Sequence, residues 1–317
     1  MDIAPFIKRI ARGKHGSEHL SRAEAESVFS ALLDPHADPL QLGAFLIGQR
    51  MKGESSTELA GFVDAARACI AGFGSFTAPP GAIDLPCYAG KRRAAHAHLA
   101  AAMQACDAGI PVFVHGAEHI DGRITAWQVL QQAGVKRAGS LSEVTTILNS
   151  EHIVYADLAD LCPELSRIYM LRPKLGIRSF SNTVARLLNP ARCDGQLNGF
   201  FHTPYADYMA MANRLLGQPR SLIFMGAEGE PELYADRQKV LLRQQGDTIC
   251  QVSYPPAGLD VYPRSQQNLN LLREHFTAML AGEVSQRQAA VIARMGEAFG
   301  WASTGEFPAT WTMEASS

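Results

Sequence analysis

Apolar residues recur at helical spacing in the first part of the chain. Ala25, Val28, Phe29 and Leu32 lie three or four residues apart, and the preceding Ser21-Arg22-Ala23-Glu24 has the spacing of a capping box. Two more helices are expected over residues 40–50 and 57–71. The opening of the chain therefore predicts a small helical module.

The pattern changes where Gly, Ser, Thr, Ala and Pro dominate residues 72–81, which indicates a linker. Beyond it, short apolar runs alternate with helical spacing. Strands are expected at 82–85, 112–115 and near 153–154, and helices at 94–108 and 125–133. This alternation is typical of a mainly parallel sheet covered by helices, so we predict an α/β class for this part.

A second helical stretch interrupts the α/β pattern after Cys162, and short strands are expected again at 199–201, 221–225 and 248–252. We therefore predict that the helical domain is discontinuous. It would comprise residues 1–72 and about 163–192, beside an α/β domain of about 73–162 and 193–317. A length of 317 residues agrees with two cooperating modules.

Composition excludes several classes of protein. Hydrophobic residues make up 47% and charged residues 19%, as in folded globular proteins. No signal peptide is recognised near the N-terminus, and no apolar run has the length of a membrane span. Six scattered cysteines lack the paired spacing of a zinc site, and His96 and His98 would point in different directions. We expect a cytoplasmic protein with reduced thiols, no membrane contact and no metal site.

Basic residues are unevenly distributed although the formal net charge is only −2. From Leu165 to Cys193 there is no Asp or Glu, but there are six basic residues: Arg167, Arg172, Lys174, Arg178, Arg186 and Arg192. Two shorter basic groups are Lys91, Arg92 and Arg93, and Lys8, Arg9, Arg12 and Lys14. Each group could be solvated surface charge or could bind an anionic partner.

Two stretches carry a family resemblance. Gln-Leu-Gly-Ala-Phe-Leu-Ile at 41–47 followed by Lys-Gly-Glu at 52–54, and Leu-Gly-Ile-Arg at 175–178 leading to Asn-Pro-Ala at 189–191, resemble anthranilate phosphoribosyltransferase of glycosyltransferase family 3. The likeness extends through His115-Gly116 and covers essentially the whole chain. It implies a small helical domain beside a larger α/β domain, an active cleft at their hinge, and a homodimer formed through the helical domains.

The chain departs from this family where the enzymes bind diphosphate. Their first α/β strand ends in a glycine-rich turn whose amides approach the phosphates. Here residues 86–93 read Pro-Cys-Tyr-Ala-Gly-Lys-Arg-Arg, with one glycine, a proline without an amide donor, and the bulky Tyr88. After His115-Gly116, two acids and no serine replace the family's serine-rich loop. We therefore expect the diphosphate cradle to be lost.

The magnesium pair of the family is also altered. Pro231 stands where its Asp belongs, while Glu232 is retained and Glu228 or Glu230 could compensate. His115 is left at a strand end without an obvious substrate, so no catalytic residue is assigned. The residues of this degenerate donor site are Tyr88, Gly90, His115, Gly116, Glu228, Glu230 and Glu232.

The same departures resemble the YbiB branch of the family, and this resemblance implies a dimeric nucleic-acid-binding protein without demonstrated transferase activity. Our leading interpretation is a non-catalytic homodimer, without a cofactor, whose basic clefts bind single-stranded DNA or RNA with no sequence preference. The binding residues would be Lys91, Arg92, Arg93, Arg172, Lys174, Arg178 and Arg186, with Lys8, Arg9, Arg12 and Lys14. Tyr88, Tyr169 and Phe180 could stack on bases or belong to the core.

The alternative interpretation is a glycosyl- or phosphoribosyltransferase with an unidentified acceptor. Its reorganised donor site would bind phosphoribosyl pyrophosphate through the basic turn, and magnesium through Glu228, Glu230 or Glu232.

Overall fold

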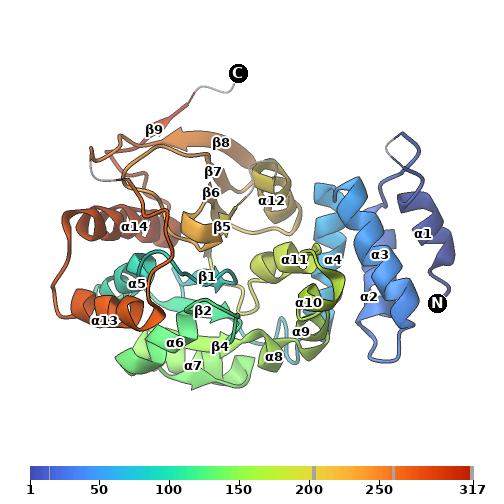
Figure 1. Cartoon of the computed structure of the whole chain (residues 1–317), viewed down its shortest axis with the longest axis horizontal. Helices are drawn as coiled ribbons and strands as arrows, with labels where there is room; N and C mark the ends of the chain where they lie inside the picture. The colour runs from blue at the N-terminus through green and yellow to red at the C-terminus, as the bar shows by residue number, and fades with distance from the viewer. Residues whose placement is uncertain (14, 202–204, 259–260, 315–317) are drawn as a thin grey trace.

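The N-terminal helices form one end of the molecule (Figure 1). The computed structural model describes all residues except 14, 202–204, 259–260 and 315–317. The helices are α1 (Ala4–Ile10), α2 (Arg22–Leu33), α3 (Pro39–Lys52) and α4 (Ser56–Cys69). Ser21 and Glu24 form the predicted capping box at the start of α2, and Asp38 caps α3 by accepting from two backbone amides. The predicted helical module is confirmed.

A nine-stranded sheet forms the larger part, in the order β3-β4-β2-β1-β5-β6-β7-β8-β9. The six strands from β3 to β6 in this order are parallel, and β7, β8 and β9 continue the sheet in antiparallel pairs. The bounds are β1 (Ile83–Cys87), β2 (Val112–Gly116), β3 (Arg137–Ala138), β4 (Ile153–Asp157), β5 (Gly195–Phe200), β6 (Arg220–Met225), β7 (Leu241–Gln245), β8 (Thr248–Ser253) and β9 (Thr312–Met313). The predicted α/β class with a mainly parallel sheet is confirmed.

Helices cover both faces of the sheet. On one face α14 (Gln286–Thr304) packs along α5 (Ala97–Asp107), with α13 (Leu269–Leu280) beside them. The remaining elements of this part are α6 (Ala126–Leu130), η1 (Gln131–Ala133), α7 (Leu141–Glu151), α12 (Tyr205–Leu215) and η2 (Ala227–Gly229). No described helix combines the length and apolar character that crossing a membrane requires. All six cysteines are free thiols.

Four short helices lie between the sheet and the N-terminal module (Figure 1). They are α8 (Leu158–Leu161), α9 (Pro163–Tyr169), α10 (Arg172–Leu175) and α11 (Ser181–Leu187). Phe180 stacks on Phe62 of α4 at 4.2 Å between ring centroids and meets Phe29 edge-on at 5.1 Å. Arg167 Nη2 donates to the carbonyl oxygen of Leu32 at 3.0 Å, at the end of α2. These contacts join the two helical segments in one core, while the domain boundaries stay a prediction.

Candidate functional site

A cleft of about 380 Å³ lies between the loops at the carboxyl ends of the strands and the middle helices. Loops after β1, β2, β5 and β6 supply one wall, the segment around α10 supplies the other, and α3 contributes its last turn. The lining residues are Arg50, Arg92, Arg93, Arg123, Arg172, Gly176, Ile177, Arg178, Phe201 and Glu228. Six of these ten residues are arginines and one is acidic, so the cleft concentrates positive charge.

The arginine side chains of the cleft repel one another. Burial, with the neighbouring Arg186 and Arg172, lowers the pKa of Arg178 to about 10, so it remains charged at neutral pH. Burial and the charge of Arg92 also lower the pKa of Arg123. Among the described residues, none of the six cleft guanidinium groups forms an ion pair with a carboxylate. An anion in the cleft would relieve this repulsion.

Most of the predicted basic residues from the middle of the chain meet here. Arg92, Arg93, Arg172 and Arg178 line the cleft, and Arg186 lines an adjoining pocket of about 90 Å³. Lys174 is exposed on α10 but contributes to none of the described pockets. Two cleft arginines were not predicted from the sequence. They are Arg50, in the last turn of α3, and Arg123, whose only signal was its place in the altered loop after Gly116.

The turn after β1 has its backbone amides occupied by the protein's own carboxylates. Glu230 Oε1 accepts from the amides of Ala89, at 2.9 Å, and Gly90. The two carboxylate oxygens of Glu228 accept from the amides of Arg92 and Arg93, both at 3.0 Å. Amides that a phosphate would need are therefore already bonded to an anion.

The segment that carries these glutamates is tightly held. Glu228 has φ 59°, a left-handed conformation that is uncommon for a residue other than glycine. Its carboxylate also accepts from the Tyr262 hydroxyl at 3.0 Å. A Cβ on Gly226 would lie 1.8 Å from the carbonyl oxygen of Glu230, so the segment can close onto the turn only with glycine there.

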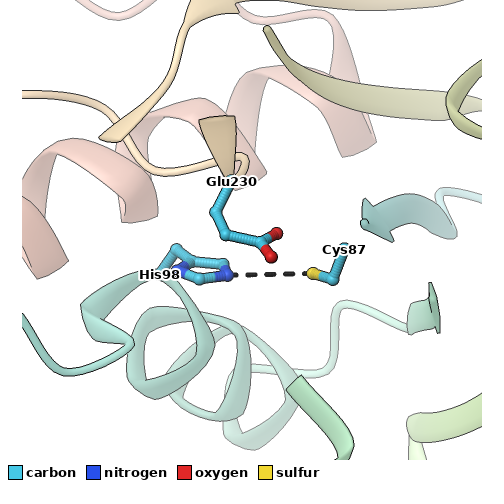
Figure 2. Close-up of side chains that lie close together, drawn as sticks. All are labelled: Cys87, His98 and Glu230. Atoms are coloured by element: carbon cyan, nitrogen blue, oxygen red, sulfur yellow. Dashed lines mark hydrogen bonds between the residues drawn. The ribbon is translucent and has the colours of Figure 1, made fainter. Parts of the chain in front are cut away.

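Beneath the turn, the fold brings together a group that the sequence did not predict. Figure 2 shows Cys87, His98 and Glu230 pointing toward one another from β1, α5 and the segment after β6. All three are buried, and their candidate ligand atoms lie within 4.8 Å of one another. From the sequence, His98 was considered only together with His96. In the structure, His96 Nε2 instead lies 3.0 Å from the carbonyl oxygen of Ile124. The sequence alone did not suggest this group, because Glu230 lies far from Cys87 and His98 in the chain.

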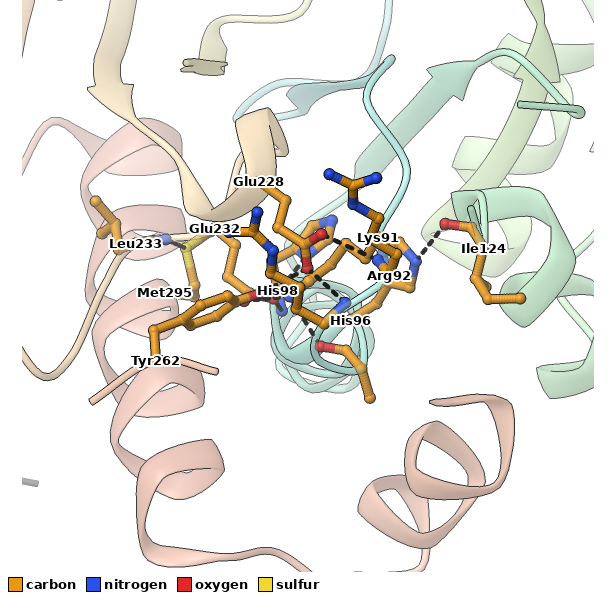
Figure 3. Close-up of polar contacts among 12 residues, drawn as sticks. Lys91, Arg92, His96, His98, Ile124, Glu228, Glu232, Leu233, Tyr262 and Met295 are labelled. Carbon is orange, nitrogen blue, oxygen red and sulfur yellow. Dashed lines mark hydrogen bonds and ion pairs between the residues drawn. The ribbon is translucent and has the colours of Figure 1, made fainter. Parts of the chain in front are cut away.

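Lys91 is not a cleft residue, which corrects the sequence prediction. Its side chain is completely buried and forms an ion pair with Glu232 (Figure 3). Its ammonium group also donates to the carbonyl oxygen of Ala95 at 2.9 Å. Burial alone would raise the pKa of Glu232, but Lys91 and His98 hold it well below its usual range. A lysine committed to a buried carboxylate cannot contact a phosphate in the cleft.

The N-terminal basic residues are also separate from the cleft. Arg9 pairs with Glu24 at 2.6 Å and with Glu18 at 3.3 Å, and Arg12 reaches Glu18 at 3.5 Å. Lys8 is exposed on α1, which lies on the outer side of the helical module (Figure 1). Lys14 lies outside the described residues. Acidic partners pair with two of the four residues, Arg9 and Arg12, so a contribution of this group to nucleic-acid binding stays a prediction.

The remaining residues of the predicted donor site are buried, and two of them, Tyr88 and His115, are hydrogen-bonded to each other. The Tyr88 hydroxyl lies 2.8 Å from His115 Nδ1, and His115 Nε2 lies 3.1 Å from Asp84 Oδ1. Tyr88 and Phe180 belong to the core, whereas Tyr169 is half-buried and donates to the carbonyl oxygen of Tyr88 at 2.9 Å. Tyr88 and Phe180 are therefore excluded as base-stacking side chains. A Cβ on Gly116 would meet the carbonyl oxygen of Cys87 at 2.2 Å.

A helical module beside a helix-covered, mainly parallel sheet, with a cleft between them, defines the anthranilate-phosphoribosyltransferase-like fold. Anthranilate phosphoribosyltransferase from Thermus thermophilus superposes with a TM-score of 0.75 at 22% identity, over 95% of this chain and 89% of that one. The enzyme from Saccharomyces cerevisiae in complex with PRPP and Mg also gives 0.75, at 15% identity over 96% and 89%.

Sequence comparisons relate the chain to the glycosyl transferase family. Residues 4–69 match the helical bundle domain of the glycosyl transferase family. An uncharacterized protein of Aquifex aeolicus is 31% identical over 86% of this chain and 84% of its own, and uncharacterized protein YbiB of Escherichia coli is 27% identical over 84% of each. An anthranilate phosphoribosyltransferase of Methylocella silvestris is 30% identical over 73% of this chain and 64% of its own. The chain therefore carries the helical bundle domain of the glycosyl transferase family on an anthranilate-phosphoribosyltransferase-like fold, and its homologues include both YbiB and anthranilate phosphoribosyltransferases.

Proposed function

We propose that this protein is a non-catalytic, cytoplasmic nucleic-acid-binding protein whose arginine-lined cleft contacts the phosphate backbone. The observation that carries the proposal is the charge of the cleft. Its six arginines have no carboxylate partner among the described residues, and both carboxylate oxygens of its single acid, Glu228, accept from turn amides. Arginine binds phosphate in bidentate geometry, so such a surface suits a chain of phosphates.

A single strand suits this cleft better than a duplex. The arginines come from loops and short helices, and no long helix or β-ribbon projects from the described cleft residues toward a major groove. Phe201 lines the cleft and is 49% exposed, which places an aromatic side chain beside the arginines. Phosphate contacts and stacking are both tolerant of sequence. We therefore expect little sequence preference, with DNA and RNA as equal candidates.

A homodimer is the proposed assembly. Beside α1 and α3 lies a hollow of about 830 Å³ whose lining includes Ile7, Ala44 and Ile47. On α3, Leu40 is 80% exposed and Met51 79% exposed. Uncovered apolar surface of this kind is typical of an interface. The family resemblance makes a second copy of the chain the expected occupant, and light scattering at micromolar concentration reporting a monomer would refute it.

The alternative, a transferase that uses phosphoribosyl pyrophosphate and magnesium, fits the turn less well. It would need Glu228, Glu230 or Glu232 as magnesium ligands, but these carboxylates accept from turn amides or pair with Lys91. We expect no anthranilate phosphoribosyltransferase activity. Growth of a tryptophan-requiring strain that lacks the enzyme, rescued by this gene alone, would contradict that expectation.

One experiment separates the two functions. Single-stranded DNA is titrated over a series of salt concentrations, and phosphoribosyl pyrophosphate with magnesium is titrated separately by calorimetry. Our proposal expects DNA binding that weakens steeply with salt and no heat from the small ligand. Binding of phosphoribosyl pyrophosphate without binding of DNA would overturn the proposal in favour of the transferase.

A further inference from the structure

The buried group of Cys87, His98 and Glu230 has the dimensions of a metal site. Cys87 Sγ and His98 Nε2 are 3.7 Å apart, and a carboxylate oxygen of Glu230 lies within 4.8 Å of both (Figure 2). A tetrahedral zinc ion with ordinary Zn–S and Zn–N bond lengths holds its sulfur and nitrogen ligands about 3.6 Å apart. The spacing of Cys87 and His98 therefore matches that of two ligands of one zinc ion, and the Glu230 carboxylate lies beside them.

His98 is oriented as a metal ligand would be. Its Nδ1 lies 3.0 Å from Glu232 Oε2, and the other oxygen of Glu232 pairs with Lys91 (Figure 3). A carboxylate at Nδ1 fixes the tautomer with the proton on that nitrogen and leaves the Nε2 lone pair facing Cys87. Carboxylate, histidine and metal in this order are a common arrangement at zinc sites.

Glu230 supplies an independent sign that a cation belongs here. Its Oε1 accepts from the amides of Ala89 and Gly90, whereas Oε2 is buried and has no hydrogen-bond partner among the described residues. Leaving a buried carboxylate oxygen unpartnered is costly. A cation bound to Oε2 would remove that cost.

We propose that Cys87, His98 and Glu230 bind a single zinc ion that fastens β1, α5 and the segment after β6 together. A thiolate, an imidazole and a carboxylate form a donor set that suits zinc and is too soft for magnesium. The thiolate and carboxylate charges balance the charge of the ion, so the buried site is neutral overall. Binding forms the Zn–S bond and releases the thiol proton to solvent. This site is independent of nucleic-acid binding in the cleft.

Metal binding to the refolded protein tests the site. The full-length chain is unfolded with a chelator, refolded without metal, and titrated with zinc alone or with cobalt as a spectroscopic substitute. We expect one equivalent per chain, a thiolate-to-cobalt charge-transfer band, and a higher melting temperature with zinc. Cys87→Ala should abolish the band and the thermal shift. Cys193→Ala removes another fully buried thiol and should retain both.

Two results would overturn the proposal. One is a wild-type protein that is folded by circular dichroism but binds neither ion, which would leave only a thiol–imidazole hydrogen bond at this place. The other is an unchanged cobalt band in Cys87→Ala, which would put the thiolate elsewhere. If Cys87→Ala does not fold, Glu230→Gln gives the second measurement, because it keeps the amide contacts through a neutral oxygen and should weaken zinc binding about tenfold or more.

Discussion

The turn after β1 has two sides that use the same kind of residue in opposite ways. On the inner side, Lys91 is buried against Glu232 and holds the turn to the segment after β6. On the outer side, the next two residues, Arg92 and Arg93, direct only their backbone amides to Glu228 and leave their side chains in the cleft. Of the three basic side chains of this turn, the fold therefore pairs the first with a buried carboxylate and leaves the other two at the cleft.

The largest effect is expected on the inner side. Lys91→Met should lower the free energy of unfolding by about 3–5 kcal/mol, because it leaves the buried Glu232 carboxylate without its lysine partner and with only its contacts to His98. Chemical denaturation measures this loss. Lys91→Met combined with Glu232→Leu should recover part of it, since neither charge then remains buried. If Lys91→Met alone is as stable as the wild type, the ion pair on the inner side does not hold the turn.

The outer side should govern binding instead of stability. Arg92→Ala with Arg93→Ala should flatten the slope of log affinity against log salt for single-stranded DNA by about 1.4, from about 0.7 for each lost phosphate contact. The free energy of unfolding should change by less than about 0.5 kcal/mol per substitution. Arg273→Ala on α13, outside the cleft, is the matched control. An unchanged slope would place nucleic acid elsewhere.

Glu228 both holds the turn through its amides and lines the cleft, so its replacement should change stability and binding together. Glu228→Gln removes the one acidic charge of the cleft and keeps one of the two oxygens that accept from the turn amides. Affinity for single-stranded DNA should rise, and the free energy of unfolding should fall by about 1–2 kcal/mol, because one charge-assisted hydrogen bond becomes neutral and the other is lost to an NH2 group that cannot accept. Titration and denaturation of the same sample measure both quantities. Weaker binding of DNA with unchanged stability would instead indicate that the Glu228 carboxylate contacts the nucleic acid directly.

The smallest effect is expected at the N-terminal pair. The hydrogen bond from Arg9, with those from Ser21, lowers the pKa of Glu24 to about 2 from 4.5. Because the folded-state pKa is the lower one, this stabilisation is complete above about pH 5 and is lost as the pH falls toward about 2. The pair is partly exposed, so Arg9→Ala should cost less than about 1 kcal/mol at neutral pH, and this cost should disappear as the pH falls below about 2. The DNA salt slope should stay unchanged.

Local signals made much of the fold predictable from the sequence. The capping box at Ser21 and the alternation of apolar runs depend on residues a few positions apart, and the structure confirms them. β7 was not predicted because its Leu-Leu-Arg-Gln-Gln has only two apolar residues, and its place is set by pairing with β6 and β8.

The site was predictable only in part, because its chemistry depends on long-range partners. Lys91 and Glu232 are 141 positions apart, so a run of three basic residues could not reveal that its first member is neutralised. A similar separation in sequence explains why the proximity of Glu230 to Cys87 and His98 was not predicted. Arg50 is distant in sequence from every other cleft residue and reaches the cleft only through the packing of α3.

A turn whose amides are bonded to its own glutamates needs no ligand to become ordered. The amides of residues 89, 90, 92 and 93 should therefore exchange slowly with deuterium in the free protein, and nucleic acid should change their exchange little. The turn has already lost its conformational entropy when the chain folds, so association would not be slowed by a closing step there. The arginines of this turn are therefore held in position before a ligand arrives. A mobile phosphate-binding loop, in contrast, would have to become ordered each time a ligand binds.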